Sequence, residues 1–169
     1  MKATGEVMSL GRTYIEALHK AIRSLELPKY TVWSMYHKLP GTDAEVEAHI
    51  KTAEDDRLFW IAEGFRRGFS FQKIQNISKV GTFFLAPIQE CVLKMAELEK
   101  TRTVSDEDLI QLKKWGISDE RISQSSGLDL DTLEARRKKL GCTASYRMVD
   151  TCAGEFASST GYFYSTTSQ

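Results

Sequence analysis

Signals that begin and end helices recur along most of this chain, and they leave little sequence that could pair as strands. Small polar residues precede apolar-patterned runs at several points, namely Thr13, Thr42, Ser70, Ser105 and Ser118. Glycines follow many of the runs, at Gly68, Gly116, Gly127 and Gly141. Hydroxyl side chains cap helix N-termini, and glycine adopts the left-handed conformation that ends a helix. The pattern predicts an all-α fold class: a compact multi-helix domain of paired helical hairpins with an extended C-terminal tail.

The spacing of apolar residues gives approximate bounds for seven or eight helices. The expected segments are 13–27, a short helix from Thr42 or Asp43, 56–68, a short helix from Ser70, 82–101, 105–116, 118–127, and a last helix from Asp129 or Asp131 to Gly141. Residues 28–41 are rich in aromatic side chains without sustained periodicity, so we expect a packed loop there. Only the stretch after Thr143 has the pattern of extended chain.

Two segments resemble each other and predict the same local structure. Gly68-Phe69-Ser70 precedes Ile74 as Gly116-Ile117-Ser118 precedes Ile122. Each copy is expected to form a helix, a glycine turn, a short serine-capped helix and a further helix. Two copies are too few for a solenoid, so we expect a compact spacer built from paired hairpins.

The charge balance argues against a protein that gathers nucleic acid. Lys and Arg number 23, and Asp and Glu also number 23. A neutral chain has no net field to attract a polyanion, so an anionic partner would depend on a local patch. Arg66-Arg67 and Lys113-Lys114 fall in the last turns of predicted helices, where cations ordinarily compensate the helix dipole.

Cysteine usage and hydropathy indicate a cytoplasmic protein. Cys91, Cys142 and Cys152 are odd in number, and none lies at metal-ligand spacing from a histidine. Reduced thiols and no metal site are therefore expected. No apolar run approaches the roughly 20 residues that span a bilayer, and the first residues lack the apolar region of a signal peptide.

The segment from Ser118 to Gly141 offers an alternative function, because its outline is that of a DNA-binding helix-turn-helix. The second helix of this segment carries Arg136 and Arg137 near its C-terminus, where cations complement the helix dipole. Base readout uses the N-terminal part of such a helix, and here that part carries Asp131. The charge distribution therefore disfavours the DNA-binding alternative.

The sequence contains no catalytic constellation. His19 lies beside an apolar stripe, His37 in a loop and His49 on a short polar helix, so packing or surface roles are expected. Cys152 could serve a small cysteine-dependent enzyme as nucleophile, but no histidine lies near it in sequence. Residues 5–11 are neither a P-loop nor a dinucleotide fingerprint. We assign no catalytic, cofactor-binding or metal-ligating residue.

The first predicted helix carries an apolar stripe at spacings of three, four and three residues: Ile15, Leu18, Ile22 and Leu25. Such a narrow stripe is typical of helices that pair with one another. It is equally compatible with packing inside one domain, so the pattern alone leaves both roles open.

Both ends of the chain and several internal motifs resemble the large subunits of carbamoyl phosphate synthetases. The terminal motifs are Gly5-Glu6-Val7-Met8-Ser9-Leu10-Gly11-Arg12-Thr13, Val149-Asp150-Thr151-Cys152-Ala153-Gly154-Glu155-Phe156 and Tyr162-Phe163-Tyr164-Ser165-Thr166. The internal motifs include Arg57-Leu58-Phe59, Arg66-Arg67-Gly68-Phe69-Ser70 and Leu140-Gly141. The similarity covers nearly the whole chain and is weakest over residues 28–51.

The resemblance implies a fragment from the middle of that subunit. Residues 1–13 would end the upstream ATP-grasp half, 14–142 would form the helical oligomerisation domain, and 143–169 would link to the second synthetase half. In the family this domain is non-catalytic, helps associate large subunits and joins the carboxyphosphate-forming half to the carbamoyl-phosphate-forming half. Its first helix supplies subunit contacts, which assigns the apolar stripe to the oligomer interface.

The resemblance also implies the chemistry of the parent enzyme. This would be an ATP-dependent ligase that makes carbamoyl phosphate from bicarbonate, glutamine-derived ammonia and two ATP, for arginine and pyrimidine biosynthesis. ATP and Mg or Mn would be held by the flanking ATP-grasp halves, so no cofactor is expected in this fragment. The expected partners are other large subunits, those flanking halves and the glutaminase small subunit, with no nucleic acid and no membrane.

Overall fold

A computed structural model of the chain describes residues 7–25, 35–157 and 159–167. Its helices are α1 (Tyr14–Ser24), α2 (Asp43–Lys51), α3 (Arg57–Arg66), α4 (Phe71–Ser78), α5 (Thr82–Thr101), α6 (Asp106–Lys114), α7 (Asp119–Ser126) and α8 (Leu130–Lys139). Two short strands, β1 (Ser145–Met148) and β2 (Phe163–Thr166), pair antiparallel. The predicted helical fold class is confirmed.

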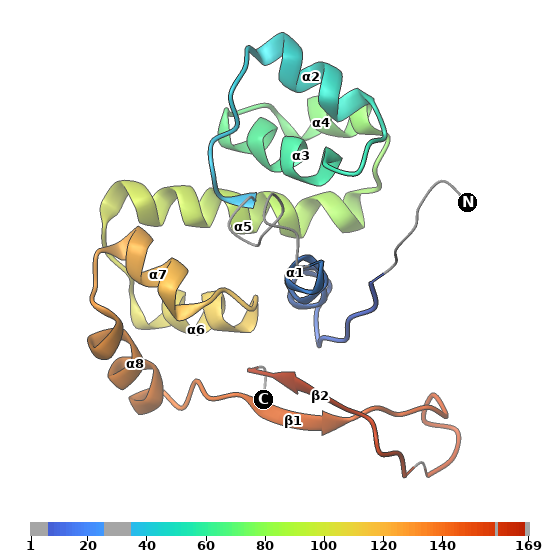
Figure 1. Cartoon of the computed structure of the whole chain (residues 1–169), viewed down its shortest axis with the longest axis vertical. Coiled ribbons are helices and arrows are strands. Elements are labelled where there is room, and N and C mark those ends of the chain that lie inside the picture. The colour runs from blue at the N-terminus through green and yellow to red at the C-terminus, as the bar shows by residue number, and fades with distance from the viewer. Residues whose placement is uncertain (1–6, 26–34, 158, 168–169) are drawn as a thin grey trace.

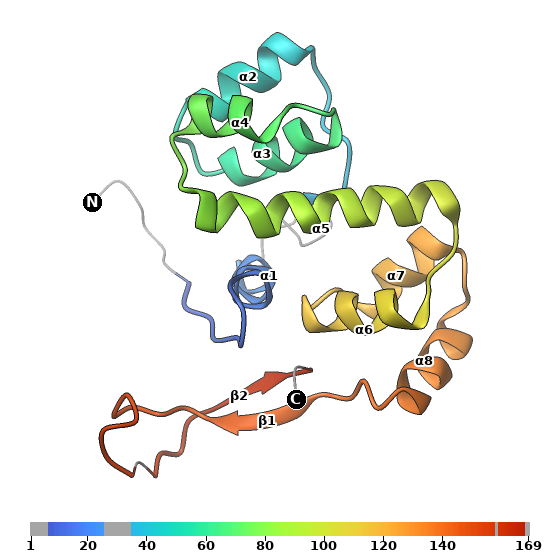
Figure 2. The same cartoon turned by 180° about the vertical axis from the view of Figure 1, so that it is seen from behind.

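The long helix α5 is the centre of the molecule. α2, α3 and α4 lie on one side of it, and α1, α6 and α7 lie on the other (Figures 1 and 2). Side chains along α5 are buried between these two groups, among them Leu85, Ile88, Val92 and Met95. α8 and the β-hairpin lie farther from α5, and the hairpin runs beneath α1 and α6 in the view of Figure 1.

Three helices end with the same glycine-centred cap, which explains the similarity seen in the sequence. The residue after each glycine donates its N–H to a carbonyl five residues earlier: Phe69 to Gly64, Ile117 to Leu112 and Cys142 to Arg137, at 2.9–3.0 Å. The glycines, Gly68, Gly116 and Gly141, have φ values of 84°, 82° and 69°. Each donating residue is buried, as the apolar contact of a Schellman cap requires. Cys142 therefore fills a core position rather than a reactive one.

The predicted helix starts are confirmed because N-caps are formed by local hydrogen bonds. The side chains of Thr13, Thr42, Ser70, Ser105, Ser118 and Asp129 each accept an N–H from the first turn of the following helix. The structure differs from the expected one at α1 and in the C-terminal tail. α1 ends at Ser24, earlier than predicted, and Leu27 with the first part of the aromatic loop lies outside the described residues. The expected extended tail folds back on itself as the β-hairpin.

Candidate functional site

The apolar stripe of α1 is divided between the core and the surface. Ile15 and Ile22 are each only 3% exposed and belong to the main hydrophobic core. Leu18 is half-buried, and Leu25 is 36% exposed. Two of the four predicted interface side chains are thus already covered within this chain. The subunit contact stays a prediction, and only Leu18 and Leu25 offer it exposed surface.

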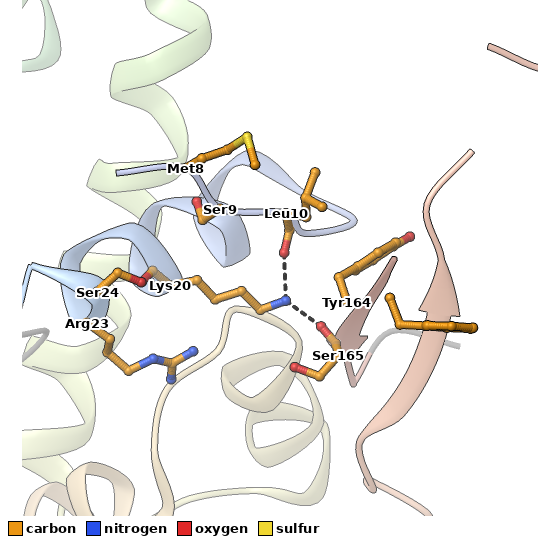
Figure 3. A pocket seen from close by; sticks show the side chains of 9 residues that line it. Met8, Ser9, Leu10, Lys20, Arg23, Ser24, Tyr164 and Ser165 are labelled. Carbon is orange, nitrogen blue, oxygen red and sulfur yellow. Dashed lines mark hydrogen bonds between the residues drawn. The ribbon is translucent and has the colours of Figure 1, made fainter. Parts of the chain in front are cut away.

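A second, polar face of α1 holds the two terminal segments of the described chain. The Glu16 carboxylate, 2% exposed, accepts the N–H of Arg12 at 2.8 Å and the hydroxyl of Thr166 at 3.1 Å. Lys20 Nζ lies 3.6 Å from Glu16 Oε1, and it donates to the carbonyl oxygens of Leu10 and Ser165 (Figure 3). We call Glu16 and Lys20 the α1 clamp. Glu16 and Thr166 are 150 residues apart in sequence, so this contact cannot be read from local pattern.

The N-terminal arm, residues 7–12, approaches the clamp closely because it contains a glycine. A Cβ atom on Gly11 would lie 2.8 Å from the backbone nitrogen of Ala17, which is too close for any other residue. Ser9 donates its hydroxyl to the carbonyl of Ala17 at 2.7 Å. The glycine-containing start of the chain is therefore a packing segment, in agreement with the absence of a phosphate-binding fingerprint.

The β-hairpin is attached to the helices beyond the clamp as well. Thr167 donates its hydroxyl to the carbonyl of Lys113 at 2.5 Å, and the Lys20 ammonium lies 5.6 Å from the centre of the Tyr164 ring. Lys113 also pairs with Asp119 at 2.8 Å. Lys113 thus makes specific tertiary contacts, which adds to the dipole compensation expected from its position.

A buried chain of hydrogen bonds joins α1, the segment before α2, α5 and the turn after α6. His19 Nδ1 is 2.6 Å from the carbonyl oxygen of Trp115, and His19 Nε2 is 2.7 Å from the Tyr36 hydroxyl. The same hydroxyl lies 2.9 Å from Cys91 Sγ. Since a carbonyl only accepts, Nδ1 carries the proton, Nε2 accepts from Tyr36, and Cys91 donates to Tyr36.

This network is structural, because burial keeps its three side chains uncharged near neutral pH. Burial lowers the pKa of His19 to about 4. Burial likewise raises the pKa of Cys91 to about 12 and raises the pKa of Tyr36 well above its ordinary value. At neutral pH all three side chains are uncharged. His19 is therefore a packed residue, as the sequence predicted, but it also satisfies two other buried groups, the Trp115 carbonyl and the Tyr36 hydroxyl.

Arg66 and Arg67 do more than compensate the dipole of α3. Both guanidinium groups pair with Glu63, whose carboxylate is 3% exposed. Their remaining N–H groups donate to backbone carbonyls of the preceding loop, those of Met35, His37, Leu39 and Gly41. The three charged residues pin that loop to α3, a tertiary role that sequence analysis missed.

The helix-turn-helix alternative finds no support in the described part of the chain. Arg136 pairs with Asp106 at 2.5 Å, and Arg137 pairs with Asp119 at 3.0 Å. Lys138 pairs with Glu134 at 2.7 Å. Three of the four cations in the last turn of α8 are thus engaged by carboxylates of the same chain, which weakens any attraction to phosphates.

The remaining sequence candidates do not assemble a reactive site. His49 stacks on Trp60 with ring centres 4.0 Å apart, and Trp60 donates its indole N–H to Asp56. Ligand atoms of His49, Glu54 and Asp56 come within 4.8 Å of one another, but exposed groups of this kind are common without an ion, and we assign none. Cys152 is half-buried in the hairpin loop, where its N–H is bound by Asp150.

None of the described helices combines the length and apolarity that crossing a bilayer requires.

Comparison with known proteins places the chain in one family. The family model for the carbamoyl-phosphate synthetase large chain, oligomerisation domain, matches residues 6–141. The chain is 40% identical over 166 residues to the "Carbamoyl phosphate synthase large chain, N-terminal section" of Aquifex aeolicus (strain VF5), across 98% of this chain and 29% of that protein. It is 42% identical over 166 residues to the "Carbamoyl phosphate synthase large chain" of Methanothrix thermoacetophila, across 98% of this chain and 15% of that protein.

The chain thus spans less than a third of the length of either relative. Its match to the family model covers the N-terminal arm and all eight helices of the described part. The polar contacts of Glu16 on α1 attach the N-terminal arm and β2 to the helices. The chain belongs to the family of the oligomerisation domain of carbamoyl-phosphate synthetase large chains.

Proposed function

We propose that this domain is the spacer and self-association element of the large subunit of a glutamine-dependent carbamoyl phosphate synthetase. The observation that carries the spacer role is the α1 clamp, which binds the N-terminal arm and β2 on the same turns of one helix. In the larger relatives these two segments would continue toward the two synthetase halves. A rigid common attachment would then fix where each half begins relative to the other.

The chemistry of the parent enzyme belongs to the same proposal. ATP and Mg or Mn would bind the flanking ATP-grasp halves, and a glutaminase small subunit would supply ammonia. The product would serve arginine and pyrimidine biosynthesis in the cytoplasm. What supports these assignments is the 40–42% identity to large chains over 98% of this chain.

Self-association through α1 would be weak in this conformation. An isologous contact of two α1 helices could bury Leu18 and Leu25 from each copy, or four aliphatic side chains. These contribute roughly 6 to 12 kcal/mol if fully transferred from water, at about 1.5 to 3 kcal/mol each. Association costs about 4 to 15 kcal/mol, so little affinity remains. Other parts of the large subunit would have to strengthen the oligomer.

The spacer role can be tested in a full-length large chain that contains this segment. The change is the double substitution Glu16→Ala with Lys20→Ala, and a matched control is Glu134→Ala with Lys138→Ala, an exposed pair at the same spacing on α8. Three rates are measured: bicarbonate-dependent ATP hydrolysis, ATP formation from carbamoyl phosphate and ADP, and complete carbamoyl phosphate synthesis. Circular dichroism checks that each variant folds.

We expect the clamp variant to keep both partial reactions within about twofold, because each half retains its own site. The rate of complete carbamoyl phosphate synthesis should fall at least tenfold, since the two halves are no longer held in a fixed relative position. The control variant should keep all three rates. A clamp variant with released terminal segments and normal complete synthesis would overturn the spacer role.

A further inference from the structure

A groove of about 510 Å³ lies between the N-terminal arm, the C-terminal part of α1 and β2 (Figure 3). We call it the β2 groove. Its lining residues are Met8, Ser9, Leu10, Lys20, Arg23, Ser24, Phe163, Tyr164 and Ser165. It is built from both segments that the α1 clamp holds, so it exists only when arm and hairpin are attached to α1.

The β2 groove has an uncompensated positive charge. Lys20 and Arg23 line it, and no Asp or Glu does. Lys20 is neutralised in part by Glu16. Arg23 makes a single hydrogen bond, to the carbonyl of Gly116 at 3.2 Å, and has no carboxylate partner among the residues that the structure describes. An occupant with a carboxylate near Arg23 would supply the charged partner that this guanidinium lacks.

One wall of the groove is a strand edge with free backbone groups. In an antiparallel ladder, hydrogen-bonded and non-hydrogen-bonded residue pairs alternate. Val149 N–H donates to the carbonyl of Tyr162 at 2.8 Å, so this pair is a hydrogen-bonded one and the next pair, Met148 with Phe163, is not. In that alternation Phe163 and Ser165 direct their backbone groups away from β1. The carbonyl of Ser165 confirms the direction, because it accepts from Lys20 on the groove side. The N–H groups of both residues and the carbonyl of Phe163 have no partner in the described parts of the chain.

Apolar side chains border the same groove. Met8 on the arm is 87% exposed, and Phe163 on β2 is 60% exposed. A two-stranded hairpin is only marginally stable alone, and exposed strand edges in natural proteins are usually paired or covered. The groove therefore combines a free strand edge, apolar borders and a cation, which are the features of a site for strand addition.

We propose that the β2 groove receives an extended acidic segment from a flanking synthetase half of the same large chain, paired on the edge of β2 with a carboxylate on Arg23. This rests on the proposed spacer function, because the groove walls are the segments that would lead into those halves. A segment of the same polypeptide has a high effective concentration, so it can occupy a shallow site that a separate peptide would fill poorly. The docked segment would lock one half against the α1 clamp.

The test uses a full-length large chain in which a benzophenone amino acid replaces Ser24. Ser24 lines the groove, and among the described residues its hydroxyl bonds only the carbonyl of Lys20, one helical turn earlier. After irradiation, mass spectrometry identifies the cross-linked peptide, and mixing ¹⁵N-labelled with unlabelled chains separates links within one chain from links between chains. The second change is Arg23→Glu, and Lys100→Glu is a control of equal charge change at an exposed position of α5.

We expect a cross-link within one chain, to a segment that contains Asp or Glu in a synthetase half. Arg23→Glu should lower its yield at least tenfold, and Lys100→Glu should leave it within twofold. The proposal would be overturned by a link to a second copy, seen as a mixed-isotope product, or by a link to the small subunit. It would also be overturned if no link formed or if Arg23→Glu did not change the yield. If the link fails while the clamp variant still uncouples the halves, the spacer function stands and only the groove assignment is wrong.

Discussion

The hydroxyl of Tyr36 donates a hydrogen bond to Nε2 of His19 across 2.7 Å, in a part of the core closed to solvent. This bond exists only while the imidazole is neutral, because a protonated Nε2 cannot accept. Protonation would also leave a charge in the core without a carboxylate partner in the described network. The contact between α1 and the segment before α2 is therefore sensitive to pH.

Acid should weaken the fold through His19. Its pKa in the folded protein is lowered by burial to about 4, against 6.5 for an exposed imidazole. Between these values the unfolded chain binds a proton that the folded chain does not. Stability is thus fully present above pH 6.5 and falls as the pH drops toward 4, by about 3 kcal/mol in total. Urea unfolding at pH 7, 6, 5 and 4 measures this loss.

The control for that measurement is a second histidine. His19→Gln should be less stable at pH 7 but should lose less free energy of unfolding between pH 6.5 and 4. His49→Gln removes a half-exposed imidazole and leaves the buried network intact, so it is the matched control. Equal pH slopes for wild type and His19→Gln would show that the network does not titrate as described.

Cys91 and Cys152 should differ strongly in their reactivity toward thiol reagents. Burial raises the pKa of Cys91 to about 12, so almost no thiolate exists at pH 8, and the sulfur has no exposed surface. Cys152 is half-buried in the hairpin loop and should react at the rate of an ordinary thiol. Mass spectrometry after iodoacetamide treatment, in buffer and in urea, measures both rates. If Cys152 is alkylated faster than free cysteine, the hypothesis of a cysteine-dependent enzyme would be supported.

Sequence reasoning succeeded where structure depends on neighbours along the chain. Ser70 and Ser118 cap the helices that follow them, and Gly68 and Gly116 end the helices that precede them. These features depend on hydrogen bonds between residues less than six positions apart, so short motifs are sufficient to predict them. The family resemblance came from longer motifs and was confirmed by comparison.

The candidate site could not be predicted in the same way. Glu16 and Lys20 are one helical turn apart, which is the pattern of an ordinary surface ion pair. The N-terminal arm and the distant Thr166 both return to this helix, and their contacts with Glu16 and Lys20 make the pair a clamp. Ile22 belongs to the core of this chain, and its place in an apolar stripe does not reveal which other helix covers it. Both depend on contacts between distant parts of the chain.

Gly64 should tolerate no side chain without loss of stability. A Cβ atom there would lie 3.0 Å from Ile50 Cδ1 and 3.2 Å from Ile74 Cδ1, where α3 packs against α2 and α4. Gly64→Ala gains up to about 1 kcal/mol of helix propensity but incurs an overpacking cost of about 1 to 3 kcal/mol. We expect a net loss of about 1 kcal/mol by urea denaturation.

A double-mutant cycle checks the cause of that loss. Ile50→Val removes the nearest atom, Cδ1, so Gly64→Ala should cost at least about 0.5 kcal/mol less in the Ile50→Val background. Strict additivity of the two changes would mean that the added methyl group does not meet Ile50.

Glutamate substitutions on α1 should distinguish its buried positions from its exposed ones by their effect on stability. Ile22 is 3% exposed, so Ile22→Glu places an unpaired carboxylate in the core and should cost at least about 3 kcal/mol, enough to unfold much of the population. Leu25 is 36% exposed, and Leu25→Glu should leave helicity and the unfolding midpoint nearly unchanged. Circular dichroism and urea denaturation measure both effects.

Leu25→Glu is therefore the substitution that reports on self-association, and Ile22→Glu cannot do so because loss of folding and loss of a subunit contact would look alike. Light scattering across a concentration series compares wild type with Leu25→Glu. If α1 forms the contact, the wild-type mass should rise with concentration and the variant should stay folded and monomeric, because two carboxylates would face each other across a two-fold axis. A variant that associates as well as wild type would remove the exposed end of α1 from the interface and place the contact elsewhere on the molecule.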